Sequence, residues 1–145
     1  MRVSDGAGRA MRTAFLDPSV LLLAVGGEHS LRPACRRVLH AASEGLRVHM
    51  SVEGGQEFLF HRLRRVERAR AVAEFDRVDQ LVVWHPFDVE VLRHSRELVR
   101  RGDARGRDAV HAATAILAGF TTIVSPDTDF DGIPGLARLD PLDLN

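Results

Sequence analysis

Short apolar runs alternate with longer stretches of helical periodicity along this chain, and this alternation limits the folds it can adopt. The apolar runs are rich in β-branched residues and predict strands over 13–16, 48–50, 81–84, 122–124 and, more weakly, 137–139. The intervening stretches carry apolar residues at three- and four-residue intervals and predict helices over 31–43, 53–63, 66–78, 89–100 and 108–117. Strands that alternate with helices predict an α/β fold, a parallel sheet covered on both faces in a three-layer α/β/α domain.

The periodic pattern begins at Met11 and shows no internal repeat or change of composition, which predicts a single domain over residues 11–145. Residues 1–10, MRVSDGAGRA, lack an apolar segment, so we expect a flexible N-terminal extension and not a secretory signal. The longest apolar run, Val20 to Val25, has six residues. A membrane-spanning helix needs roughly 20. Cys35 is the only cysteine, which excludes an intramolecular disulfide and favours the cytoplasm.

The basic residues of the chain are all arginine, and the 20 of them balance 20 acidic residues. Without lysine, P-loop and Schiff-base chemistry lose a required residue. Phospho-aspartate receivers and haloacid-dehalogenase-type phosphatases also use a lysine, so these classes are disfavoured. The charges are nevertheless segregated, with arginines concentrated in 62–70 and 93–107 and aspartates in 127–143. This separation permits a surface that binds a polyanion.

Acidic residues fall where the carboxyl edge of the predicted sheet should lie. Asp17 follows the first strand and Asp127 the fourth, while Glu57 and Asp108 lie near the starts of helices that follow strands. Ligands of parallel sheets bind at this edge. Two ionised carboxylates about 5 Å apart repel by roughly 3 kcal/mol at an effective dielectric near 20, so such a cluster implies a bound cation or protonation. Ligands that are all oxygen favour Mg²⁺ or Mn²⁺, ions that can activate water for phosphodiester hydrolysis.

The acidic stretch DTDFDG, residues 127–132, also matches the opening of an EF-hand calcium loop. The twelfth loop position, however, is Arg138 in place of a bidentate glutamate. The preceding run 121–124 is β-branched and predicts a strand where an EF-hand requires a helix. A calcium loop of this kind is therefore excluded.

Four motifs in suitable order and spacing resemble those of the PIN-domain ribonucleases, and within them the VapC toxins of bacterial toxin–antitoxin pairs. They are FLDPSVLL at 15–22, QEFL at 56–59, RDAVHAATA at 107–115 and SPDTDFD at 125–131. The resemblance implies a PIN-like fold with strand order 3-2-1-4-5 and an endoribonuclease that depends on Mg²⁺ or Mn²⁺. It further implies an RNA substrate such as tRNA or another structured RNA, a homodimer, and a cognate antitoxin whose tail fills the active site.

The same resemblance assigns roles to individual residues. It implies a catalytic, metal-binding set of four carboxylates: Asp17, Glu57, Asp108 and Asp127. Asp129 would be a further or alternative ligand, and Ser19 would orient Asp17 through a hydrogen bond.

Departures from the family pattern leave two points open. Pro18 stands where the family commonly has a threonine, which removes a hydroxyl and a backbone donor. Gly54 and Gly55 lie at the start of the helix that carries Glu57, and each costs a helix roughly 1 kcal/mol relative to alanine. The helix could therefore begin late, and Glu53 is a rival for the role of Glu57.

The arginines offer contacts to RNA, because a guanidinium forms bidentate bonds with phosphate and stacks on bases. We expect such contacts from Arg107, Arg62 and Arg65. His111 shares a helical face with Asp108, and we expect a packed histidine that donates one hydrogen bond in preference to a catalytic base. The alternative functions are a non-catalytic PIN module that binds RNA or protein, and an RNA-processing nuclease without an antitoxin.

Overall fold

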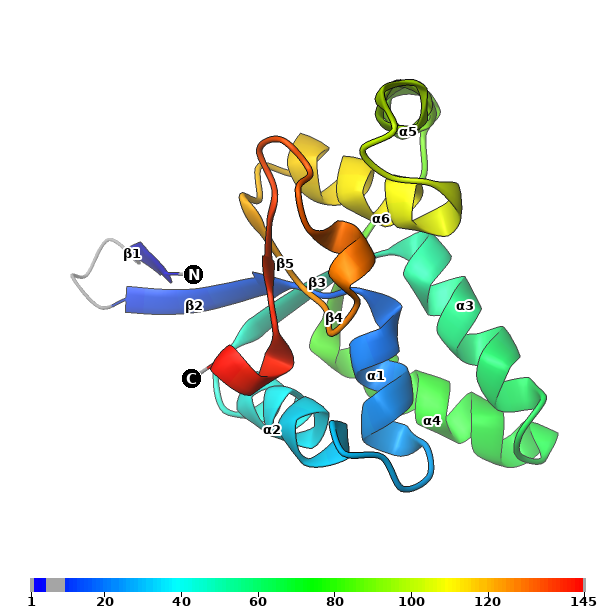
Figure 1. Ribbon diagram of the computed structural model, residues 1–145. Helices are drawn as coiled ribbons and strands as arrows, with labels where there is room; N and C mark the ends of the chain where they lie inside the picture. The colour runs from blue at the N-terminus through cyan, green and yellow to red at the C-terminus, as the bar shows by residue number, and fades with distance from the viewer. Residues whose placement is uncertain (1, 5–9, 145) are drawn as a thin grey trace.

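Strand β2 (Ala10–Phe15) and the residue after it divide the core of the protein between two helical layers. The computed structural model describes residues 2–4 and 10–144. Ala14 and Leu16 pack into one hydrophobic cluster and Phe15 into the other, and all three side chains are at most 1% exposed. Alternate residues of a strand point to opposite faces, so both faces of the sheet must be covered. The predicted three-layer α/β/α arrangement is confirmed (Figure 1).

The sheet consists mainly of parallel strands. Its members after β2 are β3 (Arg47–Ser51), β4 (Val82–His85), β5 (Thr122–Val124) and β6 (Ala137–Leu139). β3 pairs in parallel with both β2 and β4, and β5 pairs in parallel with β6. The five predicted strands, numbered 1 to 5, correspond to β2, β3, β4, β5 and β6. Their pairings give the segments 3-2-1 and 4-5 of the expected order.

A short junction links these two segments of the sheet. Leu16, directly after β2, forms a parallel bridge with Val124 at the end of β5. The amide of Asp17 donates to the carbonyl oxygen of Val124 at 3.0 Å. The link between the first and fourth predicted strands rests on this junction, which brings the ends of both strands together.

Strand β1 (Arg2–Ser4) pairs antiparallel with β2 ahead of the predicted domain. The expected extension, residues 1–10, lies partly outside the described residues, so its flexibility stays a prediction.

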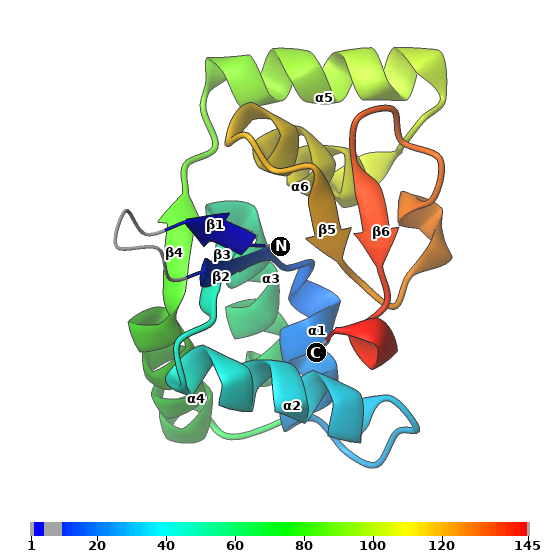
Figure 2. The same ribbon diagram turned by 90° about the vertical axis from the view of Figure 1, so that its left-hand side faces the viewer.

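Helices α1 to α4 pack against one face of the sheet, and helices α5 and α6 cover the other (Figure 2). Their bounds are α1 (Pro18–Val25), α2 (Arg32–Ser43), α3 (Val52–Leu63), α4 (Arg68–Leu81), α5 (Val89–Arg101) and α6 (Gly106–Leu117). Two short 3₁₀ turns follow, η1 (Thr128–Phe130) and η2 (Pro141–Asp143). In the part of the chain that the structure describes, every helix is too short or too polar to traverse a bilayer.

The sequence pattern predicts only an apolar run, residues 20–25, where the structure has helix α1. Pro18 occupies its first turn, where the backbone N–H has no partner within the helix. The departure from the family's threonine therefore costs this helix no hydrogen bond.

Helix α3 begins at Val52, one residue before the predicted start, so the expectation of a late start is wrong. The Oγ of Ser51 accepts a hydrogen bond from the Gly54 amide at 2.9 Å and caps the helix. A Cβ atom at Gly55 would lie 2.8 Å from Cη2 of Trp84. Close packing against strand β4 thus explains a glycine that helix propensity alone disfavours.

A buried ion pair joins α3 to α4. The Nε of Arg62 lies 2.6 Å from Oε2 of Glu74, and the two side chains are 6% and 5% exposed. Arg70 contacts the same carboxylate at 3.2 Å from the solvent side. The prediction that Arg62 contacts RNA is therefore wrong, because its guanidinium is enclosed between two helices and neutralises Glu74.

Glu74→Gln should lower the free energy of unfolding by about 3 kcal/mol, because it leaves the buried Arg62 charge without a countercharge. Urea denaturation at pH 7 measures the change, and Glu67→Gln, at an exposed position just before α4, is the matched control. Equal stabilities of the two variants would contradict the assigned role of the pair.

Candidate metal centre

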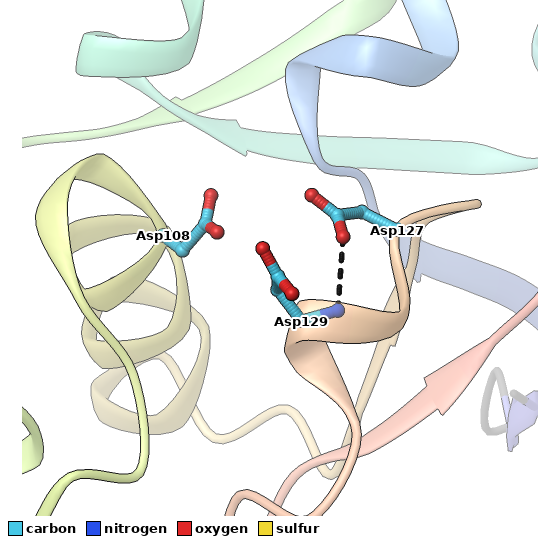
Figure 3. A group of neighbouring side chains, drawn as sticks. All are labelled: Asp108, Asp127 and Asp129. Atoms are coloured by element: carbon cyan, nitrogen blue, oxygen red, sulfur yellow. Dashed lines mark hydrogen bonds between the residues drawn. The ribbon is translucent and has the colours of Figure 1, made fainter.

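Three carboxylates from two distant stretches converge at the carboxyl edge of the sheet (Figure 3). Asp108 lies in the first turn of α6, while Asp127 and Asp129 lie at the start of η1. Each offers one oxygen, and these oxygens lie within 4.8 Å of one another. Oxygens around an octahedral Mg²⁺ are roughly 3–4 Å apart, so small side-chain rotations would bring this trio to bonding distance. The donor set therefore fits a hard divalent cation.

Asp17 lies beside the trio and is held by two hydroxyl groups. Its side chain is almost fully buried, and its Oδ2 accepts hydrogen bonds from Ser19 and, at 2.9 Å, from Ser125. The Ser19 contact is the one predicted from the sequence. Burial raises the pKa of Asp17, although both serines and His111 oppose the change. The two serine bonds fix the orientation of this carboxylate.

Ser125 connects Asp17 with the loop that carries the trio. Its side chain is fully buried, and its Oγ both donates to Asp17 and accepts from the amide of Asp127 at 3.0 Å. Sequence reasoning assigned it no role, although it stands directly after β5 inside the SPDTDFD motif. A small hydroxyl residue at the end of a buried strand was the signal that could have identified it.

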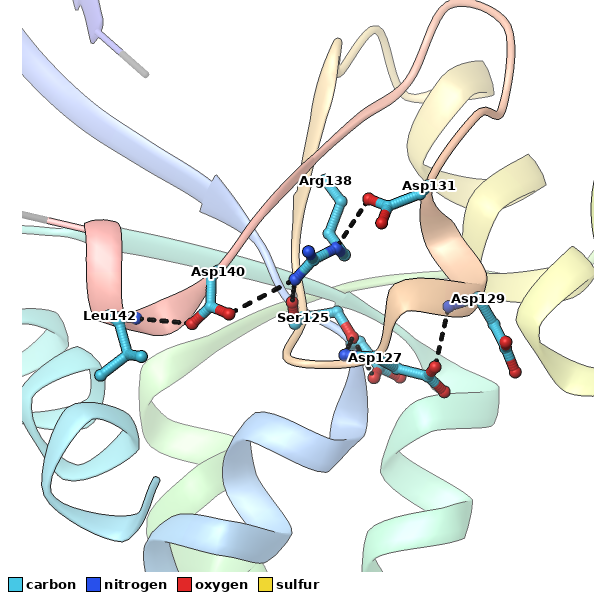
Figure 4. A network of polar contacts seen from close by, with 8 residues as sticks. Ser125, Asp127, Asp129, Asp131, Arg138, Asp140 and Leu142 are labelled. Atoms are coloured by element: carbon cyan, nitrogen blue, oxygen red, sulfur yellow. Dashed lines mark hydrogen bonds and ion pairs between the residues drawn. The ribbon is translucent and has the colours of Figure 1, made fainter. Parts of the chain in front are cut away.

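Arg138 on β6 holds the other side of this loop (Figure 4). Its Nη1 donates to the carbonyl oxygen of Ser125 at 3.1 Å, and its Nε to Oδ1 of Asp131 at 2.8 Å. Asp140 lies 3.5 Å from the same guanidinium. The arginine that excludes an EF-hand therefore neutralises Asp131 and braces the loop, which leaves Asp127 and Asp129 for the site.

A buried histidine, His111, holds the carboxylate of Glu57 in place. His111 is 1% exposed, with its Nδ1 2.8 Å from Oγ of Ser51 and its Nε2 3.3 Å from Oε1 of Glu57. If the Ser51 hydroxyl donates to Nδ1, the Nε2–H is left to donate to Glu57. Burial opposes ionisation of Glu57, but His111 and Arg107 outweigh it, so the pKa of Glu57 is lowered. Arg107 lies 3.5 Å from the same oxygen.

The structure thus sorts the predicted site residues into two groups. Asp108, Asp127 and Asp129 form the close trio, so Asp129 belongs with the main candidates. Asp17 is joined to the backbone of Asp127 through Ser125, and Glu57 lies 3.3 Å from Nε2 of His111, which is on the same helix as Asp108. Glu57, and not Glu53 one turn earlier in α3, makes these contacts.

Burial and neighbouring like charges together act on Asp108. Burial, Asp17 and Asp127 together raise the pKa of Asp108 to about 6, with a smaller contribution from Asp129. At pH 7 Asp108 is therefore mostly ionised, and its charge is repelled by its acidic neighbours. A divalent cation between them would remove this repulsion.

Comparison with known proteins agrees with this geometry. A family model described as the PIN domain matches residues 14–136. This chain belongs to the PIN-domain family. Among its relatives are two proteins of Mycobacterium tuberculosis, Ribonuclease VapC13 and Ribonuclease VapC7, each 32% identical to it. These matches cover 86% and 87% of this chain and 98% and 90% of the respective relatives. The predicted likeness to PIN-domain VapC proteins is confirmed.

A solved structure shares the fold of this PIN-domain chain. It is the crystal structure of VapBC2 from Rickettsia felis bound to a DNA fragment from its promoter, with a TM-score of 0.69 at 16% identity. The match covers 88% of this chain and 98% of that one. Identity this low shows the fold alone.

Asp108→Asn should stabilise the metal-free protein at pH 7. The pKa of Asp108 is raised from 3.8 to about 6, so the folded state binds this proton more tightly than the unfolded state. The contribution of Asp108 to stability is therefore lost as pH rises from about 4 to 6, and the variant should gain about 1–2 kcal/mol at pH 7, since water screens part of the repulsion.

Thermal unfolding in EDTA at pH 4 and pH 7 measures this difference. Asp131→Asn is the control, because it removes a charge that pairs with Arg138 outside the trio. An Asp108→Asn protein that is less stable than wild type at pH 7 would contradict the account of repulsion.

Proposed function

We propose that this protein is a metal-dependent endoribonuclease that hydrolyses RNA phosphodiester bonds and acts as the toxin of a toxin–antitoxin pair. The observation that supports it most is the convergence of Asp108, Asp127 and Asp129 at the ligand-binding edge of the sheet. The 32% identity to two proteins named as ribonucleases, over nearly their whole length, supports the reaction class.

Mg²⁺ or Mn²⁺ is the proposed cofactor. The trio would hold the ion, and Asp17 would complete its surroundings, since donors that are all carboxylate favour hard cations. When bound, such an ion lowers the pKa of water and stabilises negative charge on the oxygens of a phosphodiester. Protein ligands alone do not decide between one ion and two.

The remaining side chains orient groups around the reaction. Ser125 couples the direction of the Asp17 carboxylate to the backbone position of Asp127, so both carboxylates keep one geometry. Glu57, kept ionised by His111, can accept a hydrogen bond from the attacking water. Arg107 is 74% exposed beside Glu57 and can contact the scissile phosphate.

The proposed partner is a cognate antitoxin. One solved structure that shares this fold is described as VapBC2, and another, with a TM-score of 0.68, is described as a toxin–antitoxin complex from Klebsiella pneumoniae. An antitoxin tail that enters the carboxylate site, a homodimer, and a cytoplasmic location stay predictions.

RNA cleavage tests the proposed function. With Mn²⁺ or Mg²⁺ and a panel of structured RNAs that includes tRNA, wild-type protein should cut at defined sites. Asp127→Asn and Asp17→Asn should each lower the rate at least about 100-fold, because each disturbs stabilisation that the ion supplies in the transition state. Gel analysis of end-labelled RNA gives the rates.

Asp76→Asn, at an exposed position on α4 away from the acidic loop, is the control for this assay and should keep a rate near that of wild type. Undiminished cleavage by both site variants would reject the assigned residues. RNA binding without cleavage under either metal would favour the non-catalytic PIN module.

A further inference from the structure

A polar cavity of about 420 Å³ opens beside the carboxylate site, between α1, α3 and α6. Its lining includes Glu57, Phe60, His61, Arg64 and Arg107. The volume lies in the range of small-molecule binding sites. The cavity and the candidate metal centre share Glu57, which contacts His111 on one side and Arg107 on the other. A chain of RNA that crosses the carboxylates would therefore pass the mouth of this cavity.

The charge of the cavity suits a phosphate. Arg64 and Arg107 are exposed and face one acidic residue, Glu57, among the lining side chains. Burial and the neighbouring arginines lower the pKa of His61, so its ring is neutral at pH 7. The guanidinium groups match the planar, bidentate geometry of phosphate oxygens.

Phe60 adds an aromatic surface. Its side chain is 48% exposed although it is large and apolar. Unpaired RNA bases stack on exposed aromatic rings, with arginines holding the adjacent backbone. Phe60 lines the same cavity as Arg64 and Arg107, so the cavity has the composition of such a contact.

The structure also separates the arginines of the 62–70 run. Arg62 and Arg70 bind Glu74, and Arg65 is exposed but does not line the cavity. Arg64 is the member of the run that lines it. Within this run, Arg62 and Arg70 therefore serve a structural ion pair, and Arg64 is the candidate contact for a ligand.

We propose that this cavity binds a nucleotide of single-stranded RNA next to the scissile phosphate, with its base stacked on Phe60 and its phosphate held by Arg64 and Arg107. The proposal rests on the proposed function, because it takes the substrate to be RNA. It gives the protein a means of selecting the residue beside the cleavage site.

Fluorescence anisotropy with a labelled ten-nucleotide single-stranded RNA in EDTA tests this binding without cleavage. Arg64→Gln should weaken binding about tenfold and reduce the slope of log affinity against log salt by about 0.7, the share of one phosphate contact on a single strand. Phe60→Leu should weaken binding at least about fivefold through loss of stacking, with an unchanged salt slope.

Matched controls are Arg68→Gln, an exposed arginine of the same run at the start of α4, and Phe87→Leu, an exposed phenylalanine on the loop before α5. Both should bind within about twofold of wild type, because neither side chain lines the cavity. Equal losses in Arg64→Gln and Arg68→Gln, or no measurable binding by wild type, would overturn the proposal.

A parallel cleavage assay in Mn²⁺ separates the two proposals. Cavity-dependent RNA binding without any cleavage supports the cavity and rejects the nuclease. Normal cleavage and RNA affinity in both cavity variants rejects the cavity and leaves the nuclease standing. If the variants bind RNA as wild type does but lose affinity for a purified antitoxin, the cavity belongs to the antitoxin and the RNA proposal is overturned.

Discussion

Electrostatic repulsion among carboxylates is the constraint around which this edge of the molecule is organised. Parallel strands deliver their carboxyl ends to one edge, so residues far apart in the chain meet there. Asp108, Asp127 and Asp129 come within 4.8 Å, and Asp17 lies close enough to raise the pKa of Asp108. Such an arrangement costs folding free energy in the absence of a cation. The protein tolerates that cost because the surrounding structure holds the groups in place from several directions.

That support is distributed over the junction of the sheet. The bridge between Leu16 and Val124 joins the ends of β2 and β5, and Ser125 then connects Asp17 to the backbone of Asp127. On the far side, Arg138 binds both the Ser125 carbonyl and Asp131. These contacts fix the backbone of the acidic loop, and the side chain of Asp129 is exposed at its surface.

Much of this was predictable from local pattern. Strand positions, five of the helices and the shared edge of the acidic residues followed from periodicity and from the geometry of parallel sheets. Other features depend on tertiary contacts that have no local signature. The burial of Arg62 requires Glu74 from the next helix, the glycine at 55 requires the Trp84 ring, and the role of Ser125 requires Asp17, 108 residues away. Helix α1 was missed because its apolar residues lack the spacing of an amphipathic helix, since it is largely enclosed.

The most direct test of a cation-binding carboxylate cluster is anomalous diffraction from crystals soaked in Mn²⁺, with data collected at the manganese absorption edge. A bound ion relieves the repulsion only if it lies among the carboxylate oxygens. The account predicts an anomalous peak between Asp108, Asp127 and Asp129, with Asp17 beside it. A soaked crystal without a peak at this position, at a Mn²⁺ concentration that supports RNA cleavage in solution, would contradict it.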